Sequence, residues 1–338
     1  MSEFKIRVEA VSKIFGRNPK AAMTRVRAGL GKTELLAESN HILGLHDITL
    51  NIRAGETFVI MGLSGSGKST LIRHFNRLID PTEGRIVVDG EDILALSPAA
   101  LRTYRKRKTS MVFQRFALLP HKTVLENVIF GLVIDGVPRA EARTRGMDQI
   151  AQVGLSGFEH KYPGQLSGGM QQRVGLARAL ATDAEILLMD EAFSALDPLI
   201  RHEMQMQLRE LQARLHKTIV FITHDLDEAL LLGDHIAILK DGQLRQVGTG
   251  AEILLNPADD YVARFVRDVN RARIVTCGEL ANPAEVAVGA QEVAADATVE
   301  TAFAALAAAS GPVAVRRADG TLAGGLTARR VMEALARR

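Results

Sequence analysis

The chain has 338 residues, 47% of them hydrophobic, and a formal net charge of +3 at pH 7. This length accommodates one large α/β domain plus an appendage, with enough apolar residues for a sizeable core. No window approaches about 18 uninterrupted apolar residues, so we expect no segment that spans a bilayer. The single cysteine, Cys277, excludes an internal disulfide and fits a reducing cytosol.

Two further classes of feature are not expected. Residues 1–5 lack the apolar region of a signal peptide. The absence of clustered Cys and His argues against a structural metal site.

The first candidate phosphate loop along the chain is Gly31-Lys32-Thr33. Val26 stands where the phosphate-loop pattern requires its first glycine, and no strand-like run precedes it. We therefore assign it to a polar helical insertion of about residues 17–46, which is followed by a predicted strand at 48–52.

A complete phosphate loop follows the predicted strand Thr57–Met61. Residues 62–70 read Gly-Leu-Ser-Gly-Ser-Gly-Lys-Ser-Thr and fit G-x-x-x-x-G-K-[ST]. The glycines let backbone N–H groups face phosphate oxygens, Lys68 adds a charge for the β/γ-phosphates, and the Ser69 hydroxyl can ligate Mg²⁺. We expect ATP to contact Gly62, Ser64, Gly65, Ser66, Gly67, Lys68, Ser69 and Thr70.

A dense basic run lies between residues 102 and 108. Nucleic-acid binding is one interpretation, and a solvated helix face, which could also lie near anionic lipid headgroups, is the other. Tyr104 is the only interleaved aromatic, so we favour the solvated face and expect no nucleic-acid partner. The basic residues are Arg102, Arg105, Lys106, Arg107 and Lys108.

Helical patterns dominate residues 115–180, which we interpret as a helical subdomain. Residues 138–153 have proline at the start and Gly154 after the end, as helices often do. The loop at 115–121 carries Phe116, Leu118 and Leu119, which either pack the subdomain or form an exposed apolar contact surface.

Two further apolar runs predict central parallel strands. Residues 186–189 end in the carboxylates Asp190 and Glu191, and residues 218–222 lead to His224. Strands of this kind deliver their last side chains to the ligand-binding edge of the sheet. Asp190 is therefore placed to hold Mg²⁺ through water, and Glu191 to polarise an attacking water as general base.

In this order the motifs resemble those of an ATP-binding-cassette (ABC) ATPase over about residues 6–268. The resemblance implies a P-loop NTPase fold with a RecA-like core, a β-subdomain and a helical subdomain. It also implies that Phe15 stacks on adenine, that Gln114 is the Q-loop glutamine and that His224 is the switch histidine. The family signature corresponds to Leu166–Met170 and the D-loop to Ser194–Asp197, with Met170 where many relatives carry glutamine.

The family implies a homodimer with composite sites. Ser167, Gly168 and Gly169, which open a predicted helix, would direct their N–H groups and the positive end of the helix dipole toward the γ-phosphate held by the other subunit. The catalytic residues would be Glu191, His224 and Gln114, the Mg²⁺ ligands Ser69, Gln114 and Asp190, and Asp197 would complete the nucleotide site. By themselves, an isolated aromatic such as Phe15 and a lone histidine such as His224 are more often core residues, and their register with the other motifs favours the functional interpretation.

The insertion and the amino-acid sequences of these motifs resemble those of the ATPase subunits of glycine betaine, proline and choline importers. The resemblance implies permease subunits, an indirect periplasmic or extracellular substrate-binding protein, and a peripheral position at the cytoplasmic face of the cell membrane. It names the cargo only by association, because the ATPase never touches the solute. An amino-acid importer and a soluble non-transport cassette ATPase remain the alternatives.

The composition becomes alanine-rich after about residue 270. We predict a linker at 271–290 and a small α+β segment at 291–338. It comprises a helix that begins at 296–302, strands at 312–315 and 322–327, and a helix at 330–337. This order resembles one CBS motif, a module that can sense ionic strength or bind adenine nucleotides. Arg330 stands where a ribose-binding aspartate commonly stands, so a pairing surface between subunits is at least as good an interpretation as a nucleotide sensor.

Overall fold

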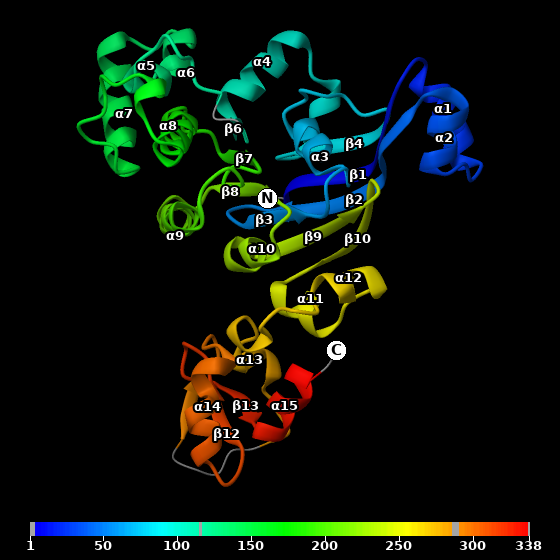
Figure 1. The fold of residues 1–338 in the computed structure, drawn as a ribbon, viewed down its shortest axis with the longest axis vertical. Coiled ribbons are helices and arrows are strands. Elements are labelled where there is room, and N and C mark those ends of the chain that lie inside the picture. The colour runs from blue at the N-terminus through cyan, green and yellow to red at the C-terminus, as the bar shows by residue number, and fades with distance from the viewer. Residues whose placement is uncertain (1–3, 115–116, 286–290, 337–338) are drawn as a thin grey trace. The chain divides into compact units, whose positions relative to one another are not determined.

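The computed structural model describes residues 4–114, 117–285 and 291–336 (Figure 1). The chain forms two compact units, Met1–Leu244 and Arg245–Arg338. The predicted domain boundary near residue 270 thus lies inside the second unit, and our domain assignment stays a prediction. None of the helices among the described residues has the length and apolar character needed to cross a membrane.

A six-stranded sheet has the strand order β10-β9-β3-β8-β7-β6, and its strands β3, β6, β7, β8 and β9 belong to the first unit. The strands from β9 to β6 are parallel, and β3, β7 and β8 are buried throughout. Continuous apolar runs produce this burial, because a parallel sheet is covered on both faces. The strands are β3 (Thr57–Met61), β6 (Thr109–Val112), β7 (Ile186–Asp190), β8 (Thr218–Thr223), β9 (His235–Lys240) and β10 (Gln243–Gly248). The predicted strands at 57–61, 186–190 and 218–222 are confirmed.

A second sheet, of order β2-β1-β4-β5, is antiparallel. Its strands are β1 (Phe4–Phe15), β2 (Ile42–Arg53), β4 (Glu83–Val88) and β5 (Glu91–Asp92). Alternate residues of β2 are buried, as expected where one face meets the core. Ile6, Ile48 and Ile86 pack in one hydrophobic cluster with Phe58 and Val220 of the central sheet, so the two sheets share a core.

The predicted helical insertion is present as α1 (Pro19–Arg27) and α2 (Lys32–Ser39). Val26 lies inside α1 and no strand leads into Gly31, so this sequence lacks the strand–loop–helix arrangement of a phosphate loop, as expected. A separate hydrophobic cluster holds the two helices on the strands; it comprises Ile14, Ala22, Met23, Val26, Leu35 and Leu43. The strand after the insertion begins at Ile42 rather than residue 48, because Ile42 pairs with Phe15 at the end of β1.

Four helices and a short turn form the predicted helical subdomain, which groups together in Figure 1. They are α5 (Val124–Val128), α6 (Phe130–Ile134), α7 (Arg139–Gln152), η2 (Pro163–Gln165) and α8 (Gly168–Ala181). The predicted helix at 138–153 is confirmed by α7. Leu118 and Leu119 are half-buried, whereas Phe116 lies outside the described residues.

The remaining helices of the first unit are α3 (Lys68–Phe75), η1 (Ile93–Ala95), α4 (Pro98–Arg107), α9 (Pro198–Leu215) and α10 (Leu226–Leu232). Arg102, Lys106 and Arg107 of the basic run are exposed, as expected for a solvated face, whereas Arg105 and Lys108 are half-buried. Arg105 donates to the backbone oxygen of Asn76 at 2.8 Å. Lys106 pairs with Asp135 at 2.7 Å, and Lys108 pairs with Asp89 at 2.8 Å and with a second carboxylate, on Glu185. Tertiary ion pairs that local sequence does not reveal therefore engage several of these charges.

The second unit contains a three-stranded sheet of order β11-β12-β13, in which β11 and β12 are parallel and β12 and β13 antiparallel. The predicted tail elements are confirmed by α14, β12, β13 and α15, whereas α13 and β11 were not predicted. The elements are α11 (Gly250–Leu255), α12 (Asp260–Phe265), η3 (Arg271–Arg273), α13 (Cys277–Leu280), β11 (Glu292–Ala294), α14 (Val299–Ala308), β12 (Val313–Arg316), β13 (Leu322–Leu326) and α15 (Ala328–Ala336).

Candidate functional site

The loop between β3 and α3 has the backbone shape that its glycines predict. Gly67 has a φ of 103°, and a Cβ atom there would lie 2.6 Å from the backbone oxygen of Gly44. Gly62 has a φ of 151° and similarly lacks space for a side chain. Only glycine fits both positions, because the left-handed conformation and the close approach each disfavour a Cβ atom.

Lys68 is enclosed by this loop. Its Nζ donates to the backbone oxygens of Gly62 at 2.7 Å and Leu63 at 3.1 Å, and only 4% of the residue is exposed. Burial lowers the pKa of Lys68, and the nearby carboxylates of Glu191 and Asp190 oppose that shift. A buried ammonium ion of this kind is stabilised by any further anion that enters the loop.

The loop also contains a buried hydroxyl without a partner. Ser66 Oγ has no hydrogen bond among the described residues. Buried polar atoms are normally satisfied, so an orphaned one at a phosphate loop fits the polar ligand that the sequence predicts.

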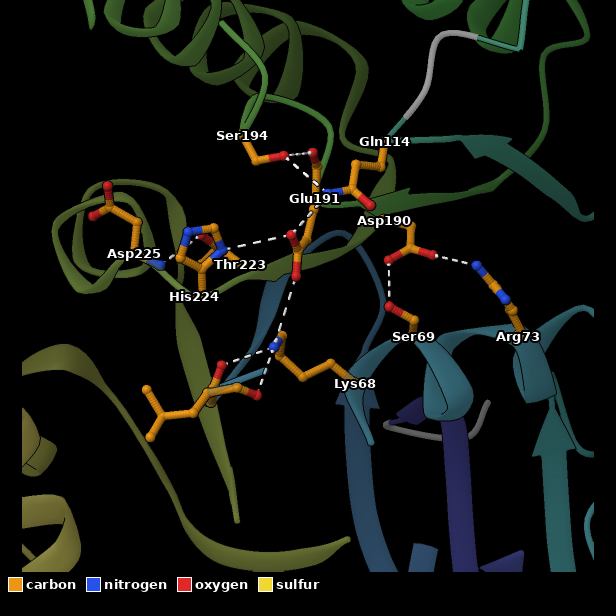
Figure 2. Close-up of polar contacts among 12 residues, drawn as sticks. Lys68, Ser69, Arg73, Gln114, Asp190, Glu191, Ser194, Thr223, His224 and Asp225 are labelled. Carbon is orange, nitrogen blue, oxygen red and sulfur yellow. Dashed lines mark hydrogen bonds and ion pairs between the residues drawn. The ribbon is translucent and has the colours of Figure 1, made fainter. Parts of the chain in front are cut away.

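Asp190, at the end of β7, faces the start of α3. Ser69 Oγ donates to Asp190 Oδ1 at 2.8 Å, and Arg73 Nη2 lies 3.2 Å from Oδ2 (Figure 2). A serine hydroxyl and a carboxylate are hard oxygen donors, and Mg²⁺ sites in nucleotide enzymes commonly combine such groups with phosphate oxygens. The residues present therefore fit the Mg²⁺ ion that the sequence predicts.

Glu191 lies one residue further along but faces a different set of groups. Its Oε2 is 3.2 Å from Gln114 Nε2 and 3.5 Å from His224 Nδ1, and its Oε1 is 3.7 Å from Lys68 Nζ (Figure 2). Its φ is 46°, a left-handed conformation that is uncommon for a residue with a side chain. Such strain is often found at functional sites, where the surrounding structure maintains it.

A cleft of about 390 Å³ runs along the phosphate loop. Besides loop residues 64–70 it is lined by Phe15, Lys32, Ile42, Leu43, Gly44, Gln114 and Glu191. Phe15 is 37% exposed, and Lys13 Nζ lies 5.2 Å from its ring centroid. The structure thus brings the predicted adenine platform, phosphate loop, Q-loop glutamine and base to one cleft, and Phe15 is no core residue.

The signature and D-loop residues do not line this cleft. Ser167 is the N-cap of α8, where its Oγ accepts from Met170 N at 3.3 Å, and Asp197 is the N-cap of α9. Gly169 lies against α9, since a Cβ atom there would be 2.4 Å from Ile200 Cγ2. A single copy of the chain therefore does not place Ser167, Gly168, Gly169 or Asp197 among the residues that line its own cleft.

Sequence reasoning missed two arginines that organise the site. Arg73 follows Ser69 by one helical turn, and that spacing was the available signal for its contact with Asp190. Arg201 donates to the D-loop carbonyls of Ser194 and Leu196 and lies 3.6 Å from Asp225, next to His224. No local pattern predicts this second contact, because α9 and α10 meet only in the folded chain.

Comparison with known sequences gives matches over most of the chain. The family model described as ABC transporter matches residues 45–194. The glycine betaine transport ATP-binding protein OpuAA of Bacillus subtilis (strain 168) is 54% identical over 281 residues, which cover 83% of this chain and 67% of that protein. The trimethylamine N-oxide transport system ATP-binding protein TmoW of Ruegeria pomeroyi is 50% identical and covers 86% of this chain and 85% of its own.

Solved structures of ABC cassettes are also similar to this chain. A dimeric bacterial ABC transporter cassette is 34% identical, with a TM-score of 0.62, and covers 72% of this chain and 98% of its own. A dimeric post-hydrolysis cassette bound to ADP and Pi is 33% identical, with a TM-score of 0.61 and the same coverage.

Proposed function

Because the chain belongs to the ATP-binding subunits of ABC transporters, we propose that it energises the import of a methylated-amine solute through a membrane permease. Glycine betaine, proline betaine and trimethylamine N-oxide occur in the names of its relatives, and we infer a cargo of this class, with choline as a further member. Proline, which carries no N-methyl group, is a further candidate cargo. The observation that carries the proposal is the 54% identity to a glycine betaine transport ATPase, combined with a complete nucleotide cleft.

ATP is the substrate of this cleft. Phe15 offers an exposed ring for the adenine, and the loop from Gly62 to Thr70 offers N–H groups and the Lys68 ammonium for the phosphates. When ATP binds, Lys68 exchanges its two carbonyl acceptors for phosphate oxygens, which carry full negative charge.

Ser69, Asp190 and Gln114 would hold Mg²⁺, which when bound neutralises charge on the phosphate oxygens. Arg73 fixes the second oxygen of Asp190 and so orients the carboxylate toward Ser69. We expect loss of Arg73 to disturb metal affinity through Asp190 rather than through direct contact.

Glu191 accepts the proton of the attacking water as general base. Gln114 and His224 each lie within 3.5 Å of one Glu191 oxygen, which supports a role for both in orienting the carboxylate and the water. Enzymes accelerate phosphoryl transfer mainly by positioning the reacting groups and by electrostatic stabilisation, rather than by covalent chemistry. The contacts of Glu191 with Gln114 and His224 would therefore be a main contribution of the protein to catalysis.

The active form is a homodimer in which each cleft is completed by the other chain. In support, Ser167, Gly168 and Gly169 begin a helix but do not line the cleft of their own chain. Free N–H groups at a helix start attract an anion, and the γ-phosphate across the dimer supplies one.

The permease subunit docks on the helical subdomain. A groove of about 320 Å³ there is lined by the apolar residues Leu125, Ile129, Phe130 and Val133 and by the charged residues Lys122, Glu126, Arg139 and Arg143, of which three are basic. It fits a short amphipathic helix of the permease with acidic residues at its edge. Docking there places the ATPase at the cytoplasmic face of the membrane, with a substrate-binding protein on the opposite side.

The test is reconstitution with the permease in proteoliposomes. Uptake of labelled glycine betaine should require ATP and should be lost with Glu191→Gln. Uptake of an amino acid other than proline, in place of the methylated amines, would support the amino-acid importer. Failure to co-purify with any multispanning membrane protein, with ATPase activity retained, would support the soluble cassette ATPase.

A further inference from the structure

We propose that Lys32, on the inserted helix α2, is a second lysine of the ATP site and binds the phosphate tail of the nucleotide. The proposal rests on the proposed function of the cleft as an ATP site. It gives the insertion, which the sequence presents only as an extra helical segment, a direct part in substrate binding.

The first observation is the position of Lys32. Its Nζ lies 3.4 Å from the backbone oxygen of Gly65 in the phosphate loop, and its side chain lines the same cleft as Phe15 and Lys68. A Cβ atom built on Gly65 would meet nothing within 4 Å, so open space remains beside this part of the loop. An anion bound to the loop at Gly65 would therefore come within reach of the Lys32 ammonium.

The second observation is the fixed placement of α2. Leu35, one turn after Lys32, is fully buried in the cluster that also contains Ile14 and Leu43. Glu38, further along α2, pairs with Arg25 of α1. Buried apolar contacts thus hold the helix on β1 and β2, and an exposed ion pair joins it to α1, so the position of the lysine is set by tertiary packing.

The third observation concerns charge. Among the residues that the structure describes, no carboxylate lies within 4.0 Å of the Lys32 ammonium, and a carbonyl oxygen is its hydrogen-bond acceptor. Lys32 is also the first residue of α2, where the helix dipole disfavours a positive charge. Neither local helix stability nor an ion pair explains a half-buried lysine here, whereas a phosphate ligand does.

The expected role is ground-state binding. Lys32 contacts the loop at Gly65, and among the described residues no hydrogen bond or ion pair joins its side chain to Glu191, Gln114 or His224. A cation that binds substrate and transition state equally well changes KM without changing kcat. We therefore expect Lys32→Ala to weaken binding of ATP about three- to tenfold, the range for a partly screened charge-assisted contact, while kcat stays within about twofold.

The experiment compares Lys32→Ala, Lys32→Arg and Lys20→Ala in the full-length chain. Lys20 is an exposed lysine on α1 of the same insertion that does not line the cleft, so it controls for loss of one positive charge. Binding of ADP and of an imido analogue of ATP is measured by titration calorimetry, and KM and kcat by steady-state ATPase. Weaker binding with Lys32→Ala, recovery with Lys32→Arg and no change with Lys20→Ala would support the proposal.

Two results would overturn it. Equal affinity of the wild type and Lys32→Ala for both nucleotides would show that the lysine does not bind substrate. A loss of affinity that disappears with the 2′-deoxy nucleotides would place the contact on the ribose rather than the phosphates. Lys68→Ala, measured in parallel, distinguishes a failure of the Lys32 proposal from a failure of the proposed ATP site. If Lys68→Ala leaves ATP binding and hydrolysis intact, the cleft is not the ATP site.

Discussion

The side-chain amide of Gln114 donates to the carboxylate of Glu191 at 3.2 Å and lies 3.4 Å from the hydroxyl of Ser194. Gln114 is close to the end of β6, where the chain leaves the central sheet toward the helical subdomain. A displacement of that subdomain would therefore change the hydrogen bonding of Glu191. This connection offers a direct physical route from permease docking to hydrolysis.

Replacement of Glu191 by glutamine should keep ATP binding and abolish turnover. The amide has the size of the carboxylate but cannot accept the proton of water, so ATPase activity should fall by about 10²-fold or more. ATP should then hold the chains together, and the mass by gel filtration with ATP should be that of a dimer. Glu210→Gln, an exposed change on α9, is the control. A Glu191→Gln variant that hydrolyses ATP normally, or stays monomeric with ATP, contradicts the assignment.

Mixed dimers test whether the site is composite. A dimer of one Lys68→Ala chain and one Gly168→Asp chain has both lesions in one site and an intact second site, if the signature acts across the interface. Its ATPase activity should exceed that of either mutant homodimer, unless both sites must fire together. The measurement uses two affinity tags to isolate the mixed species. Full activity of either homodimer would refute the composite site.

Sequence patterns predicted the local parts of this structure well. Central strands such as β7 and β8 were found at nearly their observed bounds, because a buried parallel strand needs a continuous apolar run. The phosphate loop was equally clear, because Gly62 and Gly67 are required by the backbone itself.

Contacts between distant segments were not predictable. The approach of Lys32 to Gly65 depends on how the insertion packs on β1 and β2. The pairing of Lys108 with Asp89 depends on how the end of α4 meets the turn after β4. The short elements β11 and α13 were missed for another reason. They are stabilised by pairing and packing rather than by a periodic pattern of their own.

Replacement of His74 should make stability less sensitive to acid. His74 is fully buried on α3, its Nδ1 lies 2.6 Å from the backbone oxygen of Thr70, and its Nε2 has no partner among the described residues. Burial lowers the pKa of His74 from 6.5 to about 4. Between pH 6.5 and about 4, His74 is therefore protonated in the unfolded chain but neutral in the folded chain. The free energy of unfolding is not reduced by this residue above pH 6.5, and it decreases as the pH falls toward 4.

His74→Asn keeps a donor for Thr70 and removes the titration. Between about pH 7 and pH 5, the free energy of unfolding of the wild type should fall by about 2 kcal/mol more than that of the variant. Denaturant unfolding at several pH values measures this difference. Parallel pH dependences for the two proteins would show that His74 does not contribute.

Removal of the tail should spare hydrolysis and alter regulation or assembly. The residues that line the nucleotide cleft all belong to the first unit. A cut before Asn270 removes η3 together with α14, which it contacts, whereas a cut at residue 279 would divide α13. Phe303, Leu322 and Met332 are exposed apolar residues of the tail, and we expect the two tails of a dimer to pair through such surfaces.

The measurement compares full-length and 270–338-deleted ATPase in proteoliposomes at matched assembly, across a range of internal salt. Hydrolysis by the isolated subunit should stay nearly intact, while the salt response of transport or the stability of the dimer changes. Identical salt responses and identical dimer stability would remove both the sensor and the pairing hypotheses for the tail.

Glu191 has a left-handed backbone conformation, and its carboxylate contacts a different set of groups from that of the neighbouring Asp190. Asp190 is engaged by Ser69 and Arg73, while the next carboxylate is turned toward Lys68, Gln114 and His224. Their order matters as much as their charge, because each contact depends on a side chain of one particular length. A chain with Glu at 190 and Asp at 191 would have the same composition and net charge. The longer acid would crowd the hydroxyl of Ser69, and the shorter one would fall a methylene short of the glutamine.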